Sequence, residues 1–448
     1  MGFSLITRPA TDAQGNALAG ATTDAAAAYD AAQRAFSLYT GDPLAELDRA
    51  LMIAPRFGMA RLLKAWLLAL ATEPEAAAEA RRLAASLRDW PLGERERSHL
   101  AALDLVLAGE WTRGADALAR HSMTWPRDLA ALQAGHLIDF YRAGARELRD
   151  RIARALPAWG RGMPGRSALL GMHAFGLEEC GAYAAAEETG RAAIEAEPLD
   201  CWAHHAVTHV MEMQGRPADG IAWMAGREAH WAGEGNFFQV HNWWHRALFH
   251  LDLEEADRAL ALYDGPVRGA RSEVALDLVD ASALLWRVWT QGVDVGDRWV
   301  ELSSAWDAHA DGRLYPFNDW HAAMAYLGAG RAGEVDRLLA AYRGDDPSEV
   351  AGWARRTGAA LIEGFAAFAA GRHERAVEHL MGARAISGAF GGSHAQRDVI
   401  DWTLTEAAVR ARLPAATALA SERLALKPHS PVNAAFLRRA QAPLAAAS

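Results

Sequence analysis

The sequence predicts an all-α protein, a tetratricopeptide-like α-solenoid of about ten helix-turn-helix units. Strand signals are almost absent, and apolar residues recur at intervals of three and four, which is the period of an amphipathic helix. Glycine-type turns recur about 31 to 41 residues apart, close to the roughly 34 residues of a tetratricopeptide unit. Such units stack side by side, so we expect an array that is either open or curled around a central pocket.

The repeat pattern is clearest between Gly181 and Pro198, where a glycine turns between two helices and a proline ends the second. A small residue follows the turn at Ala186, as it does at Gly114 and Gly220, and lets the two helices approach closely. Similar turns can be placed at Gly41, near Thr72, at Gly109, Gly144, Gly181, Gly215, Leu251 or Asp252, Gly292, Gly330 and Gly371, and near Arg412. We expect a lead-in over residues 1–25, a single repeat domain over 26–440 and a frayed tail over 441–448.

Composition excludes several classes of protein. Hydrophobic residues make up 51% and charged residues 23% of the chain, which is typical of a folded protein. The formal net charge is −10 and no block is rich in lysine or arginine, so nucleic acid and membrane surfaces are not expected partners. No apolar run approaches the ~18 residues of a membrane span. Only two cysteines occur, Cys180 and Cys201, which favours a reducing, cytoplasmic location.

Two matching histidine pairs are the main functional signal. His205, His209 and Glu212 lie ten, six and three residues before the turn at Gly215, positions that line the concave wall of a tetratricopeptide unit. His241 and His245 lie ten and six residues before Leu251, in the next unit. Since neighbouring packed helices lie ~8–10 Å apart, both pairs can reach a common ligand. A structural role in helix packing is the alternative for each pair.

Further residues are placed beside these pairs. Asn242 and Trp244 adjoin the second pair, and a tryptophan at a pocket wall excludes water and can stack on a ligand. Asp319 and His321 lie near the outermost wall position of the unit that turns at Gly330. We expect these side chains to contact a bound ligand, although packing between helices also explains the tryptophan.

A glycine-rich motif precedes the last predicted wall helix. Ser393 follows two glycines and is expected to cap a helix whose first turn carries His394, Arg397 and Asp398 on one face. A helix N-terminus favours anions, and an arginine fork binds carboxylate or phosphate. The motif therefore predicts a ligand-binding group, and a capped helix with an internal Arg–Asp pair is the alternative.

Four segments together resemble a known family. They are His209–Arg216, His241–His245, Asn318–His321 and Gly392–Asp398. The chain resembles the tetratricopeptide repeat protein 38 family over most of its length, most clearly from about residue 165 to 405. The resemblance implies an all-helical repeat fold and implies that these polar segments belong together. It implies no particular activity.

Two functions are compatible with these patterns. In the first, a pocket binds and transforms a small molecule, with His205, His209, Glu212, His241 and His245 as acid/base groups. In one variant, two to four of the histidines bind a divalent metal ion and Glu212 is a ligand or general base. In the second, the concave groove is a scaffold for a peptide or protein partner. Because histidine and tryptophan are concentrated in a few units, the sequence favours the pocket.

Overall fold

The structure is a computed structural model of the 448-residue chain that describes residues 10–233 and 235–442. Within these ranges every regular element is a helix, and β-pairing is limited to the isolated bridges Thr11–Ala17 and Thr40–Asn236. The predicted all-α, tetratricopeptide-like solenoid is confirmed. None of the described helices is both long enough and apolar enough to cross a membrane.

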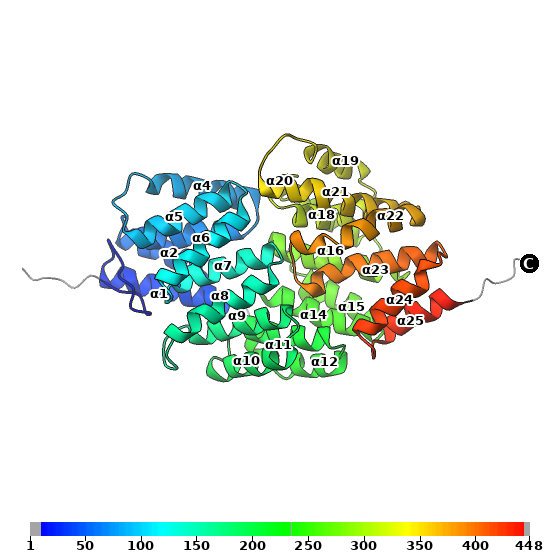
Figure 1. The fold of residues 1–448 in the computed structure, drawn as a ribbon, viewed down its shortest axis with the longest axis horizontal. Coiled ribbons are helices and arrows are strands. Elements are labelled where there is room, and N and C mark those ends of the chain that lie inside the picture. Colours follow the sequence, from blue (N-terminus) through cyan, green and yellow to red (C-terminus); the bar gives the residue numbers. More distant parts are fainter. Residues whose placement is uncertain (1–9, 234, 443–448) are drawn as a thin grey trace, which may run out of the picture.

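Most helices form antiparallel pairs joined by short turns (Figure 1). The pairs of the first half are α1 (Thr23–Leu38) with α2 (Pro43–Ile53), α3 (Gly58–Leu70) with α4 (Pro74–Leu87), α5 (Glu94–Leu107) with α6 (Trp111–Thr124), α7 (Leu129–Tyr141) with α8 (Ala145–Ala155), and α9 (Arg166–Glu179) with α10 (Tyr183–Ala196). The later pairs are α11 (Cys201–Met213) with α12 (Pro217–Ala225), α14 (Gln239–Asp252) with α15 (Ala256–Leu262), α16 (Ala275–Thr290) with α17 (Arg298–Ala305), α18 (Pro316–Gly328) with α19 (Ala332–Ala341), α21 (Ala359–Ala369) with α22 (His373–Arg384), and α23 (His394–Arg410) with α24 (Ala415–Leu426).

Other helices lie between or after these pairs. They are α13 (Glu228–Trp231), α20 (Glu349–Trp353) and α25 (Pro431–Gln441), with single 3-10 or π turns at Leu156–Ala158, Tyr263–Val267, Trp306–Ala308, Ala354–Gly358 and Ser387–Ala389. The first helix begins at Thr23, close to the predicted end of the lead-in. The predicted tail begins at residue 441, and its residues 443–448 lie outside the described residues.

A left-handed residue ends the first helix of each pair. At Gly109, for example, the backbone has φ 79° and its N–H bonds to Val106, while Glu110 N–H bonds to Leu105. Positive φ occurs at Gly41, Thr72, Gly109, Ala143, Gly181, Gly215, Glu254, Gly292, Gly330, Gly371 and Arg412. Nine of these are positions proposed from sequence, and the other two differ: Ala143 replaces Gly144, and Glu254 replaces Leu251 or Asp252. The left-handed conformation costs a residue with a Cβ only ~1–2 kcal/mol, so packing can impose it without glycine.

Close packing explains the small residues that follow the turns. A Cβ added at Gly114 would lie 2.5 Å from Cγ2 of Val106, on the partner helix α5. At Gly220 it would lie 2.3 Å from the ring of Phe249, on α14 of the next unit. Such distances are far inside van der Waals contact, so a side chain at either position would separate the helices.

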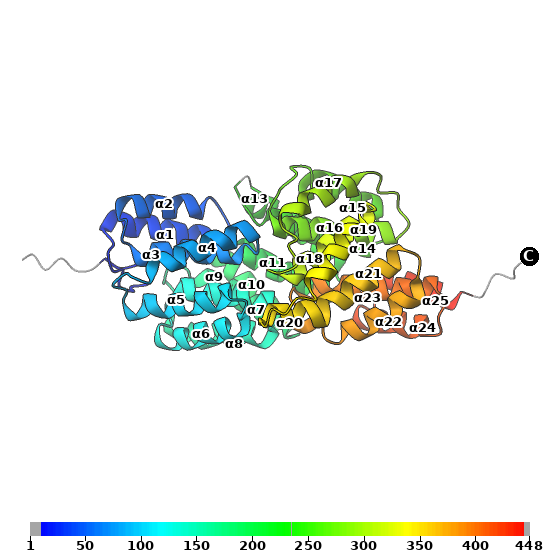
Figure 2. The same ribbon diagram turned by 90° about the horizontal axis from the view of Figure 1, so that it is seen from above.

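The stack of units curls until distant units meet. Val350 N–H donates to the carbonyl of Gly109 over 3.2 Å, and Asn318 donates to the carbonyl of Thr72 over 3.0 Å. Both views place α20 beside helices of the first units (Figures 1 and 2). One apolar core extends from Leu18 to Leu419, and a smaller one lies around Trp402 and Phe436. The curl buries the predicted concave wall: all residues of α11 are buried.

Candidate functional site

Helix α11 carries the first histidine pair into the centre of the molecule. The Asp200 side chain caps the helix by accepting the Ala203 N–H over 2.9 Å, which fixes where the helix begins. His205 and His209 are one turn apart and project from the same face. Helix α14 of the next unit projects His241 and His245 at the same spacing. The turn of that unit lies at Glu254 rather than at Leu251, so this pair lies three residues further from its turn than the sequence predicts, and the two pairs nevertheless face each other.

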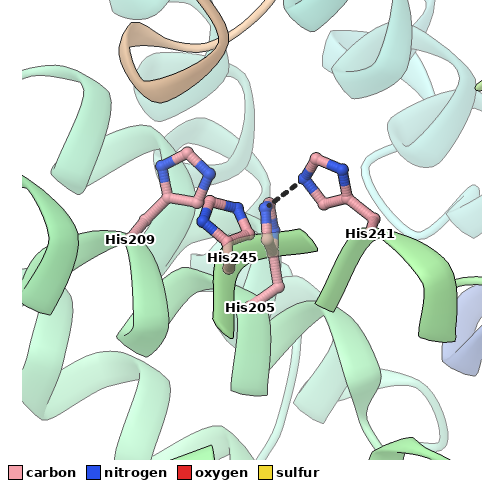
Figure 3. Close-up of side chains that lie close together, drawn as sticks. All are labelled: His205, His209, His241 and His245. Atoms are coloured by element: carbon pink, nitrogen blue, oxygen red, sulfur yellow. Dashed lines mark hydrogen bonds between the residues drawn. The ribbon is translucent and has the colours of Figure 1, made fainter. Parts of the chain in front are cut away.

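The four imidazoles form one cluster (Figure 3), which we call the core histidine cluster: His205, His209, His241 and His245. Neighbouring ring centroids lie between 4.4 and 5.1 Å apart. Nε2 of His205 lies 3.0 Å from Nε2 of His241. Each residue offers one nitrogen such that all four nitrogens lie within 4.8 Å of one another. The structure therefore brings together the four histidines that the repeat register placed on one wall.

Carboxylates from other helices face three of these rings through Nδ1. The pairs are His241–Asp280 at 2.8 Å, His209–Glu178 at 3.4 Å and His245–Glu212 at 3.9 Å. In neutral His241 the Nδ1–H donates to Asp280, so the Nε2 that faces His205 carries a lone pair. A carboxylate behind an imidazole in this way orients the ring and makes its other nitrogen a better ligand.

Burial disfavours a positive charge on three of the four imidazoles, those of His205, His209 and His245. Desolvation lowers the pKa of His209 to about 3, and neighbouring histidines would repel any proton on it. Burial lowers the pKa values of His205 and His245 well below the usual range. Among the described residues, neither nitrogen of His209 or of His245 has a hydrogen-bond partner, nor does Nδ1 of His205. Neutral imidazoles with free lone pairs are the form in which histidine binds metal ions.

Cations from the last units reach the surrounding carboxylates. Lys427, which follows α24, donates to Oε1 of Glu212 over 2.9 Å. Burial disfavours the ammonium, but the charge of Glu212 and of other carboxylates raises the pKa of Lys427, so the pair is ionic. Glu179 accepts the backbone N–H of His394 over 2.9 Å, and Arg397 lies 3.7 Å away. Burial opposes ionisation of Glu179, yet His394 and Arg397 lower its pKa to about 2.

The glycine-rich motif binds a carboxylate of the protein itself. Ser393 caps α23 and forms a capping box with Gln396, as the sequence predicts for the cap. The group at this helix N-terminus is Glu179, whose Oε2 lies 2.9 Å from Nδ1 of His394. Asp398 does not join them, because its carboxylate faces Arg423 at 2.9 Å, on α24.

The remaining predicted site residues divide into two groups. The Trp244 ring stacks on His241 with centroids 5.2 Å apart, and Asn242 is buried with neither amide atom hydrogen-bonded within the described chain. Asp319 is instead engaged away from the histidines, accepting from Gly312 N–H at 3.1 Å and Tyr342 O–H at 3.0 Å. His321 donates to the carbonyl of Phe317 over 2.8 Å and packs between aromatic rings.

Three carboxylates and one lysine at the site were missed from the sequence: Glu178, Glu179, Asp280 and Lys427. Glu178 could have been found, since it lies three residues before Gly181, as Glu212 lies three before Gly215. Asp280 and Lys427 do not lie ten, six or three residues before a turn, so the repeat register does not place them on the inner wall.

Comparisons with known proteins do not assign a family. No family model matches the chain. A crystal structure described as the APC/C hetero-tetramer Cut9-Hcn1 is similar at 14% sequence identity and a TM-score of 0.43, over 93% of this chain and 76% of that chain. The resemblance to the tetratricopeptide repeat protein 38 family therefore stays a prediction.

Proposed function

We propose that this helical-repeat protein binds a transition-metal ion at the core histidine cluster. The observation that carries the proposal is the set of four imidazoles, three of them buried and one partly buried, whose ligand nitrogens lie within 4.8 Å of one another. Leaving a buried polar atom unpaired costs ~1–3 kcal/mol, and this cluster contains several such atoms. A bound ion would satisfy them together.

Distances are compatible with such an ion. A tetrahedral ion with bonds of about 2.0–2.1 Å separates two ligand nitrogens by about 3.3 Å. The Nε2 atoms of His205 and His241 are 3.0 Å apart, so little movement is needed for them to share one ion. Imidazole ligands suit zinc, copper, nickel and iron, whereas calcium and magnesium prefer oxygen.

Charge supports the same assignment. Within the described ranges, neither Glu178 nor Asp280 has a lysine or arginine within 4.0 Å, whereas Glu212 pairs with Lys427. Burial, and then the charge of Glu179, raises the pKa of Glu178 well above its usual range, as expected for a carboxyl without a cation beside it. A divalent cation at the four imidazoles would favour ionised carboxylates around it, with Asp280 as the outer partner of His241.

Catalysis at this centre stays a prediction. An ion held by all four imidazoles has no open position, so catalysis would require one imidazole to leave it, after which the ion would polarise a substrate oxygen or lower the pKa of a bound water. Around it, Asp280 would hold the tautomer of His241 and Trp244 would exclude water from that ring. Binding and transformation of a small molecule is the use that these residues support.

Metal analysis tests the proposal. Full-length protein, stripped with a chelator and reloaded with Zn²⁺, is expected to retain about one equivalent in the four-histidine site. The double variant His205→Ala/His241→Ala is expected to lose it. His121→Gln removes a buried histidine from a different cluster and is the control, expected to retain the ion. Absence of stoichiometric metal from the reloaded wild type would reject the proposal.

Partner binding is the second candidate, supported by the helical-repeat architecture, a common scaffold for protein partners. Exposed apolar side chains lie on the second helices of four units: Met52, Met123, Val300 and Leu426. Because α11 is buried, a partner would bind this outer face rather than an open inner groove. Cross-linking of co-purified partners to these helices, unchanged in His205→Ala/His241→Ala, would assign the function to the scaffold.

A further inference from the structure

We propose a second cation site next to the first, formed by Glu178, Glu179 and Nδ1 of His209. This second site rests on the proposed function, because the ion in the core histidine cluster would bind the other nitrogen of His209. One ligand atom from each of the three residues lies within 4.8 Å of the others, and all three side chains are buried. The two sites together would form a two-cation centre with His209 between the ions.

Glu178 is the first observation in favour. It is 1% exposed, and neither carboxylate oxygen has a hydrogen-bond partner in the described structure. Its Oε2 lies 3.4 Å from Nδ1 of His209. A buried carboxyl group without a hydrogen-bond partner is costly, and a bound cation would satisfy its oxygens.

His209 is an independent observation. The side chain is fully buried and both ring nitrogens lack hydrogen-bond partners among the described residues. Nδ1 faces Glu178, and the ring packs against His205 and His245 with centroids 4.4 and 4.5 Å away. The two nitrogens of an imidazole point in different directions, so each can bind an ion once the ring proton is released to solvent.

Glu179 completes the set and has partners that orient it. Its oxygens accept the backbone N–H of His394 and face Nδ1 of His394, both over 2.9 Å, and Arg397 lies 3.7 Å away. A carboxylate has about four lone-pair positions, so these bonds leave room for a metal ion. The His394 side chain is 44% exposed, which places this side of the site next to solvent.

The two sites differ in the ions they suit. Imidazoles favour Zn²⁺ or Cu²⁺, whereas a site with two carboxylates and one imidazole also suits Mn²⁺ or Fe²⁺. Ions on the two nitrogens of one imidazole lie about 6 Å apart, because the ring and two bonds of about 2.0–2.1 Å separate them. This spacing is wider than the ~3.5–4 Å of two-metal hydrolases, so an oxygen ligand, such as a carboxylate or phosphate, would bind to the second ion alone.

Sequential loading tests the second site in the full-length chain. Chelated protein receives one equivalent of Zn²⁺ and is then titrated with Mn²⁺, followed by electron paramagnetic resonance. The wild type is expected to bind one equivalent of Mn²⁺ in addition to zinc. Glu178→Gln keeps the shape of the side chain and is expected to weaken Mn²⁺ binding by at least about tenfold while zinc stays bound.

Glu212→Gln is the matched control, because Glu212 occupies the equivalent position of the next unit but belongs only to the first site. It is expected to bind manganese as the wild type does. If a variant folds poorly, the second site can still be tested in the wild type. With Cu²⁺ in the first site, Mn²⁺ bound in the second site is expected to broaden the copper signal in the electron paramagnetic resonance spectrum.

Three results would overturn the proposal, and they differ from failure of the first site. Zinc binding without manganese binding or copper broadening in the wild type would reject the second site and leave the first. Weaker zinc binding in Glu178→Gln, with manganese unchanged, would make Glu178 an outer partner of His209. No metal at either site would reject both proposals.

Discussion

Two buried histidine clusters with similar ligand spacing differ in how their nitrogens are used. In the first half of the chain, His99 and His121 share Oδ2 of Asp128 at 2.9 and 3.1 Å. Their other nitrogens are also bonded, Nδ1 of His99 to Trp66 at 3.1 Å and Nδ1 of His121 to Ser98 at 3.0 Å. In the core histidine cluster most ring nitrogens have no partner.

This difference shows that the spacing of ligand atoms alone does not identify a metal site. Both groups place their ligand atoms within 4.8 Å. Arg95 supplies the counter-charge of Asp128. All four ring nitrogens of His99 and His121 have hydrogen-bond partners, so none is free to bind an ion. At the core histidine cluster, Lys427 pairs with Glu212, but most ring nitrogens have no hydrogen-bond partner among the described residues. We therefore expect unsatisfied nitrogens, rather than proximity alone, to distinguish a metal site from a structural network.

Removing Asp128 gives the largest expected effect on stability. Asp128→Ala removes one of the two buried carboxylates that pair with Arg95, the other being Asp12, and also removes the cap of α7; breaking a buried ion pair costs about 3–5 kcal/mol. Chemical denaturation should detect this loss, while zinc content should stay at the wild-type value. A loss of zinc in this variant would break the distinction between the two clusters.

Zinc binding gives the second largest expected effect on the free energy of unfolding. An ion that binds the native state at 100 times its Kd raises the unfolding free energy by about 2.7 kcal/mol. Denaturation of wild type and Asp128→Ala, each with and without Zn²⁺, is expected to show this gain in both. His205→Ala/His241→Ala should show none, and a gain equal to wild type would place the ion elsewhere.

The smallest expected effect is the dependence of stability on pH. Burial lowers the pKa of His99 from its usual 6.5, so below about pH 6.5 the unfolded chain binds a proton that the native state does not. Stability therefore falls as pH falls, by up to about 1.4 kcal/mol per pH unit for this one group. His99→Gln should reduce that slope in metal-free protein, measured by denaturation between pH 7 and 5. An unchanged slope would show that His99 is protonated in the native state.

The repeat register could be predicted because it depends on local backbone chemistry. Glycine tolerates positive φ, so Gly109, Gly215 and Gly330 mark turns in the sequence and have φ near 70° in the structure. Counting back from Gly215 placed His205 and His209 on the inner wall, whereas His241 was counted from Leu251, and the turn of that unit lies at Glu254. Ala143 and Glu254 adopt the same conformation without glycine, and for that reason their turns were misplaced by one to three residues.

The surroundings of the site could not be predicted because they depend on how far the solenoid curls. Asp319 and His321 occupy a wall position in their own unit, but the curl directs Asp319 to Tyr342 rather than to the core histidine cluster. Asp398 likewise faces Arg423, on the partner helix. The hydrogen bonds of Asp319 and Asp398 depend on which helices pack against each other, and the spacing of residues along one helix does not predict that packing.

Closure by the last units has a consequence for the order of folding. Lys427 reaches Glu212, and His394 reaches Glu179, each across 215 residues of sequence. Contacts between residues so far apart form late, because the entropy of closing the loop must be overcome first. We therefore expect the early units to stack while Glu179 and Glu212 still face water, and the interior to become dry only when α23 and α24 dock.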